Sequence, residues 1–488
     1  MADKDEEQQQ QQPLHILFFP FLIPGHLIPM ADIAVVFAAR GVRCTILTTP
    51  VQASIIGSIV DRANSNDDLS SQSVHVAVVP FPDVGLPPAG QRGTGLVSQE
   101  DKVKFGRAVQ LLREPFERFL ADSHADLDAV VSDGFYHWSV DVAAEYGVPR
   151  LMFLGMGVFA RSCSEHVLSQ EHRHNPDGDD PDAVVSLPGL PHGVELRRSQ
   201  MMKEPHYLEF FRCVYAAGRR SYGELFNSFQ ELERDSAEHY RTTLGGRAWF
   251  VGPVALASGS KDVASRGTDA HSLDADGCLR WLDSKPAGSV AYVAFGTLTS
   301  FSPEQLRELA RGLDISGKNF VWVISGADAA SSDLWMPEGF QTASRGYIIR
   351  GWAPQVLILN HPAMACFVTH CGWNSTLEAV SAGVPMMTWP RYADQFFNEK
   401  LVVDVLKVGV SVGARDNASS AEAHQVIGGG VIAKCVTRLM EVQGDVMRKK
   451  VEDLGVKARD AVEKGGSSYG DVGRLVDDLK ARRSRQRD

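Results

Sequence analysis

Polar residues that could bind a phosphorylated ligand gather in the stretch from Trp352 to Gln395. Within it, ACFVTH is a short apolar run that suits a buried parallel strand, and STLEAVSAG after it has the pattern of a helix. His370, Asn374 and Ser375 therefore stand where the carboxyl end of a strand meets the amino end of a helix. Free backbone N–H groups and the positive end of the helix dipole make that place a natural phosphate site.

The same stretch carries groups that could bind the rest of a nucleotide sugar. Glu378 lies one turn further along the predicted helix, and Asp394 and Gln395 stand at the matching point of the next strand–helix unit. Ligands of open parallel sheets collect at this edge. A planar aromatic residue, a phosphate site, a carboxylate and a carboxylate–amide pair would together fit a base, a pyrophosphate, a ribose and a sugar.

A second pair of candidate residues, His26 and Asp133, lies in the first third of the chain. His26 follows the predicted strand HILFFPFL, and Asp133 ends the predicted strand DAVVSD, 107 positions later. Parallel strands end at the same edge of a sheet, so the two side chains can meet. A histidine can take a proton from a hydroxyl, and a carboxylate behind it would fix its tautomer and stabilise the imidazolium. From these residues alone, His26 could also be an ordinary turn residue.

Strand–helix alternation occurs in two blocks and predicts two parallel, doubly wound sheets. The first block runs from HILFFPFL to WFVGPV, and the second begins at SVAYVAFGT. Between them, LASGSKDVASRGTDAHSLDAD is a polar run of small residues and the best candidate for a linker. The pattern weakens from Arg161 to Gln200, where HRHNPDGDDPDA has the composition of a loop. A cleft between the two domains is the expected ligand site.

The length and composition are those of a globular protein with at least two domains. The chain has 488 residues, of which 44% are hydrophobic and 22% charged. A formal net charge of −11 argues against a nucleic-acid or anionic-membrane partner. No apolar run reaches the ~18 residues of a membrane span, and MADKDEEQQQQQ is expected to be a disordered tail and not a signal peptide.

The cysteines and histidines do not predict a metal site. Seven scattered cysteines suit a reducing compartment and not a disulfide framework. Cys366, His370 and Cys371 lie close together in the sequence but lack the paired spacing of a zinc site. We therefore expect these residues to serve packing or the phosphate site.

The 44 residues from Trp352 to Gln395 resemble the signature of plant secondary-metabolite UDP-glycosyltransferases. The matching features are WAPQ, THCGWNS, the glutamate of TLEAV, GVP, WP and the closing DQ. FPFLIPGHLIPM, NSFQELE, WFVGPV, CLRWLDSKPAGSVAYVAFG and GGSSYGD are also similar to that family. The resemblance implies the GT-B fold, an α/β architecture of two doubly wound Rossmann-like domains that face each other across a cleft.

Five segments follow from the composition and the resemblance. They are a disordered tail (1–12), an acceptor-binding N-terminal domain (13–255), an interdomain linker (256–274), a UDP-sugar-binding C-terminal domain (275–465) and a C-terminal helix (466–488). In that family the last helix usually crosses back to the first domain, and the resemblance implies the same here.

The resemblance also implies roles for the residues that match the family's motifs. It makes His26 the catalytic base and Asp133 its partner. The implied donor site has Trp352 on the uracil, the Ala353 backbone at the base edge, Gln355 and Glu378 at the ribose, His370, Asn374, Ser375, Gly296 and Thr297 at the diphosphate, and Trp373, Asp394 and Gln395 at the sugar, with Gly25 and Gly372 completing it. Without the motif, Trp352 and Trp373 would be assigned to core packing.

The reaction that the resemblance implies is inverting, UDP-glucose-dependent O-glucosylation of a small lipophilic plant metabolite. A flavonoid or other phenolic is the first expectation for the acceptor, and a terpenoid or steroid the next. The family's variable loops, here 81–110 and 155–210, would build the acceptor pocket. Gln395 favours glucose, because family members that use galactose often carry histidine there. We expect no cofactor and no metal, a cytoplasmic monomer, and only the UDP-sugar and a small-molecule acceptor as partners.

Alternatives remain open. A non-catalytic UDP-sugar sensor would keep the donor site and lose the dyad, and C- or N-glycosylation would fit the same residues. GMGVFA imitates the dinucleotide fingerprint GxGxxA, but no strand precedes the acidic residues downstream.

Two departures from the family's pattern concern the sugar. Gly155, Met156 and Gly157 stand where a hydroxyl residue is expected, so a hydroxyl contact to the sugar would be missing or replaced by backbone. Arg391 and Tyr392 stand where relatives often carry an apolar pair, and they add polarity beside the sugar and the acceptor. Solvent or the acceptor is the expected contact of Arg391.

Overall fold

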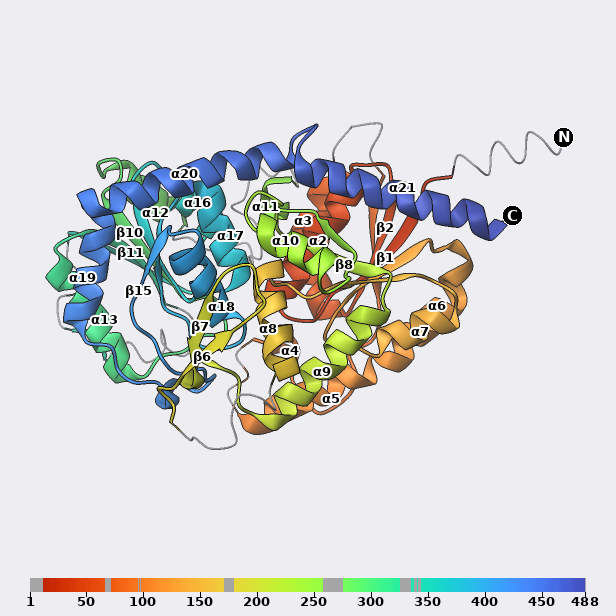
Figure 1. The fold of residues 1–488 in the computed structure, drawn as a ribbon, viewed down its shortest axis with the longest axis horizontal. Helices are drawn as coiled ribbons and strands as arrows, with labels where there is room; N and C mark the ends of the chain where they lie inside the picture. Colours follow the sequence, from red (N-terminus) through yellow and green to blue (C-terminus); the bar gives the residue numbers. More distant parts are fainter. Residues whose placement is uncertain are drawn as a thin grey trace.

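The computed structural model describes residues 12–65, 72–94, 96, 98–170, 180–257, 275–324, 335–337, 340 and 344–487 of the chain. Within these ranges the chain forms two large parallel sheets, each flanked by helices, in an elongated molecule (Figure 1). The two doubly wound sheets predicted from the sequence are confirmed. The predicted tail, linker and histidine-containing loop fall largely on 1–11, 258–274 and 171–179, which lie outside the described residues.

The first sheet is seven-stranded and parallel, in the order β3-β2-β1-β4-β5-β8-β9. The apolar run of β1 is fully buried, and β1 pairs with β2 on one side and β4 on the other. The strand order therefore reverses between β1 and β4, and such a switch point is where open sheets bind ligands. The strands are β1 (His15–Phe19), β2 (Arg43–Thr48), β3 (Val74–Val78), β4 (Ala129–Asp133), β5 (Arg150–Phe153), β8 (Gly223–Phe226) and β9 (Ala248–Phe250).

The helices of this half connect the strands and cover the sheet. Pro24 and Pro50 begin α2 and α3, at the first-turn position where a missing backbone N–H loses no helical hydrogen bond. The helices are α2 (Pro24–Ala38), α3 (Pro50–Asn64), α4 (Pro88–Gln91), α5 (Gln99–Leu111), α6 (Arg113–Ser123), α7 (Ser139–Glu145), α8 (Val158–Gln170), α9 (Pro205–Arg220), α10 (Arg234–Thr242) and α11 (Val254–Ala257), with short 3-10 turns at His124–Asp126 and Arg198–Gln200.

The second sheet is six-stranded and parallel, in the order β12-β11-β10-β13-β14-β15. Its switch point lies between β10 and β13, so the residues after these two strands share one edge. The strands are β10 (Val290–Ala294), β11 (Asn319–Ile324), β12 (Gly346–Arg350), β13 (Met364–Thr369), β14 (Met386–Thr388) and β15 (Gly409–Ser411).

The helices of the second half include the one that the signature stretch predicts. α17 ends at Gly383, which has the left-handed φ of 73° expected of a C-terminal glycine. The helices are α12 (Ala275–Asp283), α13 (Pro303–Ser316), α16 (Gln355–Leu359), α17 (Trp373–Ala382), α18 (Gln395–Lys400), a π-helical turn (Leu401–Val405), a 3-10 turn (Ala421–Ala423), α19 (Gly429–Met440), α20 (Val442–Val462) and α21 (Ser467–Arg487).

The final helices join the two halves. Figure 1 shows α20 beside the second sheet and α21 continuing along the same side of the molecule to the first. Val472, Leu475 and Leu479 of α21 are buried in the apolar core of the first sheet. The Asp471 carboxylate accepts a hydrogen bond from the backbone N–H of Phe250, 2.9 Å away. The helix after residue 466 therefore packs on the N-terminal half.

A second connection between the halves lies near the antiparallel hairpin of β6 (Val184–Leu187) and β7 (Val194–Arg197), in the region where the sequence pattern is weak. After it, the Ser199 carbonyl accepts a hydrogen bond from the Asn417 backbone N–H at 2.9 Å. The Gln200 amide donates to the carbonyl of Ala414 at 3.2 Å, and the Gln200 carbonyl accepts from the Asn417 side chain at 3.0 Å. These bonds hold 199–200 against 414–417 of the other half.

Candidate active site

The predicted dyad forms at the switch point of the first sheet. His26 lies in the first turn of α2 and Asp133 is the last residue of β4. The His26 Nδ1 is 2.7 Å from Asp133 Oδ2, and the other oxygen of Asp133 accepts the backbone N–H of Phe135 at 2.9 Å. Because a carboxylate accepts, Nδ1 must carry the proton and Nε2 keeps its lone pair. Nε2 is therefore able to act as a base.

The surroundings of His26 adjust its basicity in two directions. Burial lowers the pKa of His26, whereas the charge and hydrogen bond of Asp133 and the charge of Asp394 raise it. The raising effects are larger together, so the pKa of His26 lies above its ordinary 6.5. The side chain is still 16% exposed, while Asp133 is fully buried. A partly exposed histidine that is oriented by a buried carboxylate suits general base catalysis.

Glycines let the chain pass close to the dyad. Gly155 has a left-handed φ of 72°, and a Cβ there would lie 3.4 Å from the imidazole of His26. The rings of Phe21 and Phe135 approach the imidazole with centroids at 5.7 and 5.0 Å. The His26–Asp133 pair thus lies among largely apolar side chains.

An anion site forms at the switch point of the second sheet; we call His370, Gly296, Gly372 and the first turn of α17 the anion cradle. A Cβ on Gly296 would lie 2.9 Å from the His370 ring, and one on Gly372 only 2.4 Å from it, so both glycines are required by the closeness of the imidazole. Burial lowers the pKa of His370 to about 4, which keeps the ring neutral at pH 7. Its Nδ1 is buried without a partner among the described residues. A phosphate oxygen would supply that partner and would also meet the free N–H groups of α17.

The predicted ribose residues are brought together beside the cradle. Gln355 begins α16, and its amide donates to Glu378 at 2.7 Å and to the hydroxyl of Ser375 at 3.0 Å. Trp352, three residues before α16, is half-buried, and Ala353 is buried. Thr297 is exposed in the turn that follows β10. The Gln355 amide and the Glu378 carboxylate therefore lie together beside α17, whereas the position of the Trp352 ring at the base stays a prediction.

Asn374 connects the two switch points directly. Its side-chain amide donates to the carbonyl of Gly25 at 2.7 Å, one residue before His26. Its Oδ1 is buried without a partner within the described ranges. The donor-site residues Gly25 and Asn374 thus meet across the two halves. Their hydrogen bond fixes the position of α17 relative to the turn that carries His26.

Of the two predicted sugar residues after β14, Asp394 lies close enough to the dyad to interact with His26. Burial raises the pKa of Asp394, while the Asn398 amide, 2.9 Å away, and the charge of His26 act against that rise. The oxygen of Gln395 accepts the backbone N–H groups of Arg391 and Tyr392 at 2.8 and 3.1 Å. A backbone N–H can only donate, so the Gln395 amide nitrogen is the end left to serve a ligand. The Asp394 carboxylate is thus close enough to His26 to influence its charge.

Arg391 and Trp373 have surroundings that were not expected from the sequence. Arg391 was expected to meet solvent or the acceptor, but its side chain is buried over the ring of Phe301 at 4.5 Å and donates to the carbonyl of Ser300 at 3.2 Å. The expectation of a solvent contact is wrong, because aromatic stacking and a carbonyl satisfy the guanidinium inside the protein, whereas a contact with the acceptor stays a prediction. The indole N–H of Trp373 donates to the carbonyl of Asn227 at 2.8 Å, so its ring packs between the halves, whereas its role at the sugar stays a prediction.

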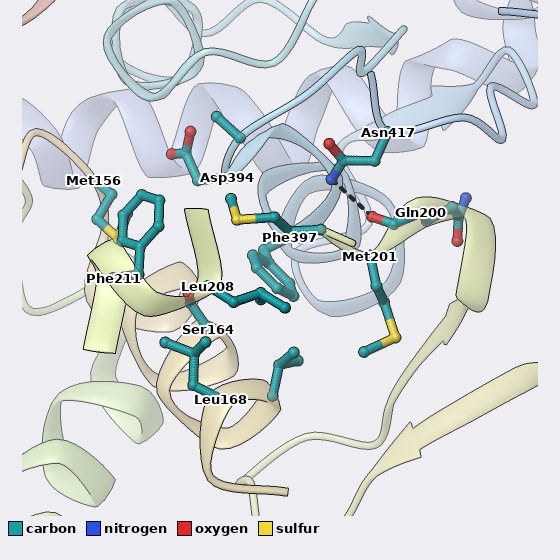
Figure 2. Close-up of a pocket in the computed structure, with 13 residues that line it drawn as sticks. Met156, Ser164, Leu168, Gln200, Met201, Leu208, Phe211, Asp394, Phe397 and Asn417 are labelled. Carbon is teal, nitrogen blue, oxygen red and sulfur yellow. Dashed lines mark hydrogen bonds between the residues drawn. The ribbon is translucent and has the colours of Figure 1, made fainter. Parts of the chain in front are cut away.

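A cavity lies beside Asp394 between the two halves and has a volume of about 40 Å³. Figure 2 shows Met156, Leu208 and Phe211 of the N-terminal half and Asp394, Phe397 and Asn417 of the C-terminal half around the same space. The residues that line it are Met156, Ser164, Val167, Leu168, Gln200, Met201, Met202, Leu208, Phe211, Ala393, Asp394, Phe397 and Asn417. Apart from Phe211, the lining residues of the N-terminal half fall in the region 155–210. Asp394 was predicted at the sugar, whereas Ala393, Phe397 and Asn417 were not predicted.

Sequence reasoning singled out Gly157 but missed Asn227 and Glu233, and all three lie around Trp373. A Cβ on Gly157 would lie 2.6 Å from the Trp373 ring and 2.7 Å from a carboxylate oxygen of Glu233. This crowding explains why glycine stands at position 157. The motif NSFQELE contains both Asn227 and Glu233 and was the available signal, but nothing in it indicates what the buried carboxylate contacts.

The described ranges hold neither a metal-binding cluster nor a helix that could span a membrane. No cluster of three or more His, Cys, Asp or Glu side chains there could hold a metal ion. Nor is any helix in those ranges long and apolar enough to cross a membrane. Metal independence stays a prediction.

Comparison with known proteins places these features in a family. Residues 248–429 match the family model described as UDP-glucoronosyl and UDP-glucosyl transferase. The chain is 41% identical over 478 residues to a scopoletin glucosyltransferase of Nicotiana tabacum, covering 96% of this chain and 98% of the relative. It is 41% identical over 488 residues to the UDP-glucose flavonoid 3-O-glucosyltransferase 7 of Fragaria ananassa, covering 97% of each.

A solved structure agrees along the same length. The crystal structure of UGT73P12 of Glycyrrhiza uralensis, in complex with glycyrrhetinic acid 3-O-monoglucuronide, matches with a TM-score of 0.89 and 38% identity over 97% of each chain. The GT-B arrangement expected from the resemblance is thereby confirmed. Since both sequence and fold agree over nearly the whole length, the chain is a glycosyltransferase and belongs to the plant family 1 UDP-glycosyltransferases.

Proposed function

We propose that this protein transfers glucose from UDP-glucose to a hydroxyl of a small phenolic metabolite and inverts the anomeric configuration. The observation that carries the proposal is that residues at the switch points of the two sheets lie next to each other. The base His26 and its partner Asp133 come from one sheet, Asp394 and the anion cradle come from the other, and Asn374 bonds to the turn beside His26. A nucleotide sugar bound along the second sheet would present its sugar to the base.

In the proposed reaction, Nε2 of His26 takes the proton of the acceptor hydroxyl as its oxygen attacks the anomeric carbon. The bond between that carbon and the UDP oxygen breaks on the opposite face, so an α-linked donor gives a β-linked product and UDP leaves as an anion. Asp133 stabilises the imidazolium, and His370 donates a hydrogen bond to the diphosphate as a neutral ring. The N–H groups of α17 supply the remaining stabilisation, so no metal ion is needed.

We propose glucose as the sugar because Asp394 and Gln395 offer one acceptor and one donor side by side. The buried oxygen of Gln395 is used by two backbone N–H groups, which fixes the direction of its amide. A site built to pair particular hydroxyls penalises a sugar that misplaces one of them. Both relatives named above are glucosyltransferases by name, which supports this choice.

The acceptor proposal rests on the cavity beside Asp394. Its lining of methionine, leucine and phenylalanine suits a flat apolar ring system, and the named relatives act on scopoletin and a flavonoid. About 40 Å³ holds only a few water molecules, so an acceptor must widen the cavity as it binds. The complex with a glycyrrhetinic acid glucuronide keeps a triterpenoid acceptor as the next candidate.

We further propose that 13–255 binds the acceptor, that 275–465 binds the UDP-sugar, and that the protein is a cytoplasmic monomer. All seven cysteines are free, which supports a reducing compartment.

The experiment is a competition of UDP-glucose, UDP-galactose and UDP-glucuronate against a panel of phenols and triterpenoids, with products identified by mass spectrometry. We expect phenol glucosides with a β-linkage by NMR. The matched control is His26→Ala, which removes the base without touching the anion cradle. Preference for glucuronate or galactose contradicts the sugar, and tight UDP-glucose binding without any product contradicts an enzyme and favours a sensor.

A further inference from the structure

Glu233 is a buried carboxylate that the reaction above does not use. Its side chain lies after β8 at the start of α10 and is 3% exposed. Burial raises the pKa of Glu233 to about 7, although hydrogen bonds to Ser228 and to backbone N–H groups oppose that rise. Burying a carboxyl group costs free energy unless it makes compensating contacts, so its contacts should indicate its purpose.

Those contacts lie at the beginning of α8. One oxygen of Glu233 accepts the backbone N–H of Phe159 at 2.8 Å, and the Val158 N–H also bonds to the carboxylate. The hydroxyl of Ser228 donates to the other oxygen. The first N–H groups of a helix have no partner within the helix, so a carboxylate there satisfies them and meets the positive end of the dipole. Glu233 thus fixes α8 from 74 residues away.

The turn that leads into α8 touches both functional surfaces. Gly155 of this turn packs on the His26 imidazole, and Gly157 lies between the Trp373 ring and the Glu233 carboxylate. Met156 between them lines the cavity beside Asp394 (Figure 2). A shift of this turn would therefore move the residues that contact His26, line the cavity and contact Trp373 at the same time.

Trp373 is tied to the same place from its other side. Its indole N–H donates to the carbonyl of Asn227, and the next residue, Ser228, donates to Glu233. Trp373 is also the first residue of α17, whose amino end belongs to the anion cradle. A continuous chain of contacts thus runs from the cradle through Trp373 to Glu233 and on to the turn against His26.

We propose that Glu233 is a positioning residue for glycosyl transfer: its carboxylate fixes the turn 155–157 and thereby sets His26 and the cavity relative to Trp373 at the start of α17. This inference rests on the proposed function, because it concerns the geometry of the same reaction. Glu233 itself touches neither the donor nor the reacting hydroxyl.

The first test compares Glu233→Gln, which keeps shape and one acceptor oxygen but loses the charge, with Glu233→Ala and with Glu238→Gln. Glu238 is an exposed carboxylate of the same helix, so it is the matched control. We expect kcat with a phenol acceptor to fall about 10- to 100-fold in Glu233→Gln, as for a small misplacement of reacting groups. It should fall further in Glu233→Ala, with UDP affinity by calorimetry and KM for UDP-glucose unchanged. Glu238→Gln should match the wild type.

A merely structural role predicts a different pattern. It would lower the melting temperature and the fraction of active enzyme, while kcat per active site stayed at the wild-type value, and that result overturns the proposal. Unchanged kcat in Glu233→Gln and Glu233→Ala also overturns it.

The second test uses Gly157→Ala, whose Cβ must displace either the Trp373 ring or the Glu233 carboxylate. If both residues act through one turn, the losses in kcat for Glu233→Gln and Gly157→Ala will not add in the double variant. Additive losses contradict a shared turn.

Hydrogen exchange separates this proposal from the proposed function. We expect faster exchange of the Val158 and Phe159 amides in Glu233→Ala than in the wild type, whatever the enzyme's substrates are. If the wild type forms no glycoside, the proposed function fails. Faster exchange in Glu233→Ala would even then support the contact between Glu233 and the first amides of α8. Unchanged exchange overturns the role of Glu233 even if the wild type is fully active.

Discussion

Replacing Asp133 by asparagine should trap His26 in the wrong tautomer. The Phe135 N–H points at Oδ1 of Asp133, and His26 Nδ1 lies 2.7 Å from Oδ2. In Asp133→Asn, the carbonyl oxygen must stay with Phe135, because an amide NH₂ there would face another donor. The NH₂ then faces His26, so Nδ1 must accept and the proton moves to Nε2. Nε2 can no longer take a proton from the acceptor.

The size of the effect follows from the same contacts. Flipping the amide to restore the productive tautomer leaves the part-buried Phe135 N–H without its acceptor, at about 1–3 kcal/mol. Losing the charged hydrogen bond that stabilises the imidazolium costs about 1.5–3 kcal/mol more. Together these give about 2.5–6 kcal/mol, or roughly 10²- to 10⁴-fold in kcat. The same range is typical of a general base.

The pH profile provides an independent check, because the base must be neutral. In the wild type the pKa of His26 is raised, so kcat/KM should fall as pH drops through a value above 6.5. In Asp133→Asn, burial is opposed only by the weaker influence of Asp394, so the pKa of His26 should fall and the acid limb should move to lower pH.

The assay is initial rate of phenol glucoside formation by liquid chromatography across pH. The control is Asp128→Asn, at the other end of the same strand region, where Asp128 accepts the His15 backbone N–H far from the base. Arg150 bonds to the carbonyl of Asp133 and not to its carboxylate, so the fold contact survives the substitution. A loss of less than about tenfold in kcat, or an acid limb that does not move, would refute this account of the dyad.

Three further predictions concern the donor site. Gln395→His should lose the preference for UDP-glucose over UDP-galactose in a competition assay, because the paired donor and acceptor are altered; an unchanged ratio contradicts the role of Gln395. Asn374→Ala should lower kcat/KM for UDP-glucose about 5- to 10-fold, because it removes one hydrogen bond between the halves, worth about 1–1.4 kcal/mol. If the steady-state kinetics of this variant equal those of the wild type, the bond to Gly25 is dispensable. Excess chelator should leave the rate unchanged, since neutral His370 and the N–H groups of α17 hold the diphosphate, whereas a loss restored by added metal would contradict the mechanism.

Much of the fold was predictable because its signals are local. Apolar runs, helix-starting prolines and the glycine that ends α17 each depend on a few neighbouring residues. The meeting of His26 and Asp133 was predictable for a topological reason, since parallel strands end at one edge whatever lies between them.

Side-chain surroundings were harder, because they depend on what the other half of the molecule brings. Arg391 was expected to reach solvent or the acceptor, but its side chain is buried against Phe301 and does not reach solvent. A sequence does not show which aromatic face is within reach. Glu233 would be assigned to a surface helix by type, since glutamate is rarely buried. Its burial follows from α8 beginning beside it, a contact between residues far apart in the sequence.

The return of α21 to the first sheet has a consequence for how the protein is made. Val472, Leu475, Val476 and Leu479 fill the core of β1 and its neighbours, yet they leave the ribosome after every strand of both sheets. During synthesis, part of the apolar core of the first sheet therefore stays exposed until α21 has been synthesised and can pack on it. Shortening the chain before residue 472 would leave the nascent protein in that unfinished state, so the damage would fall on the half of the molecule that was made first.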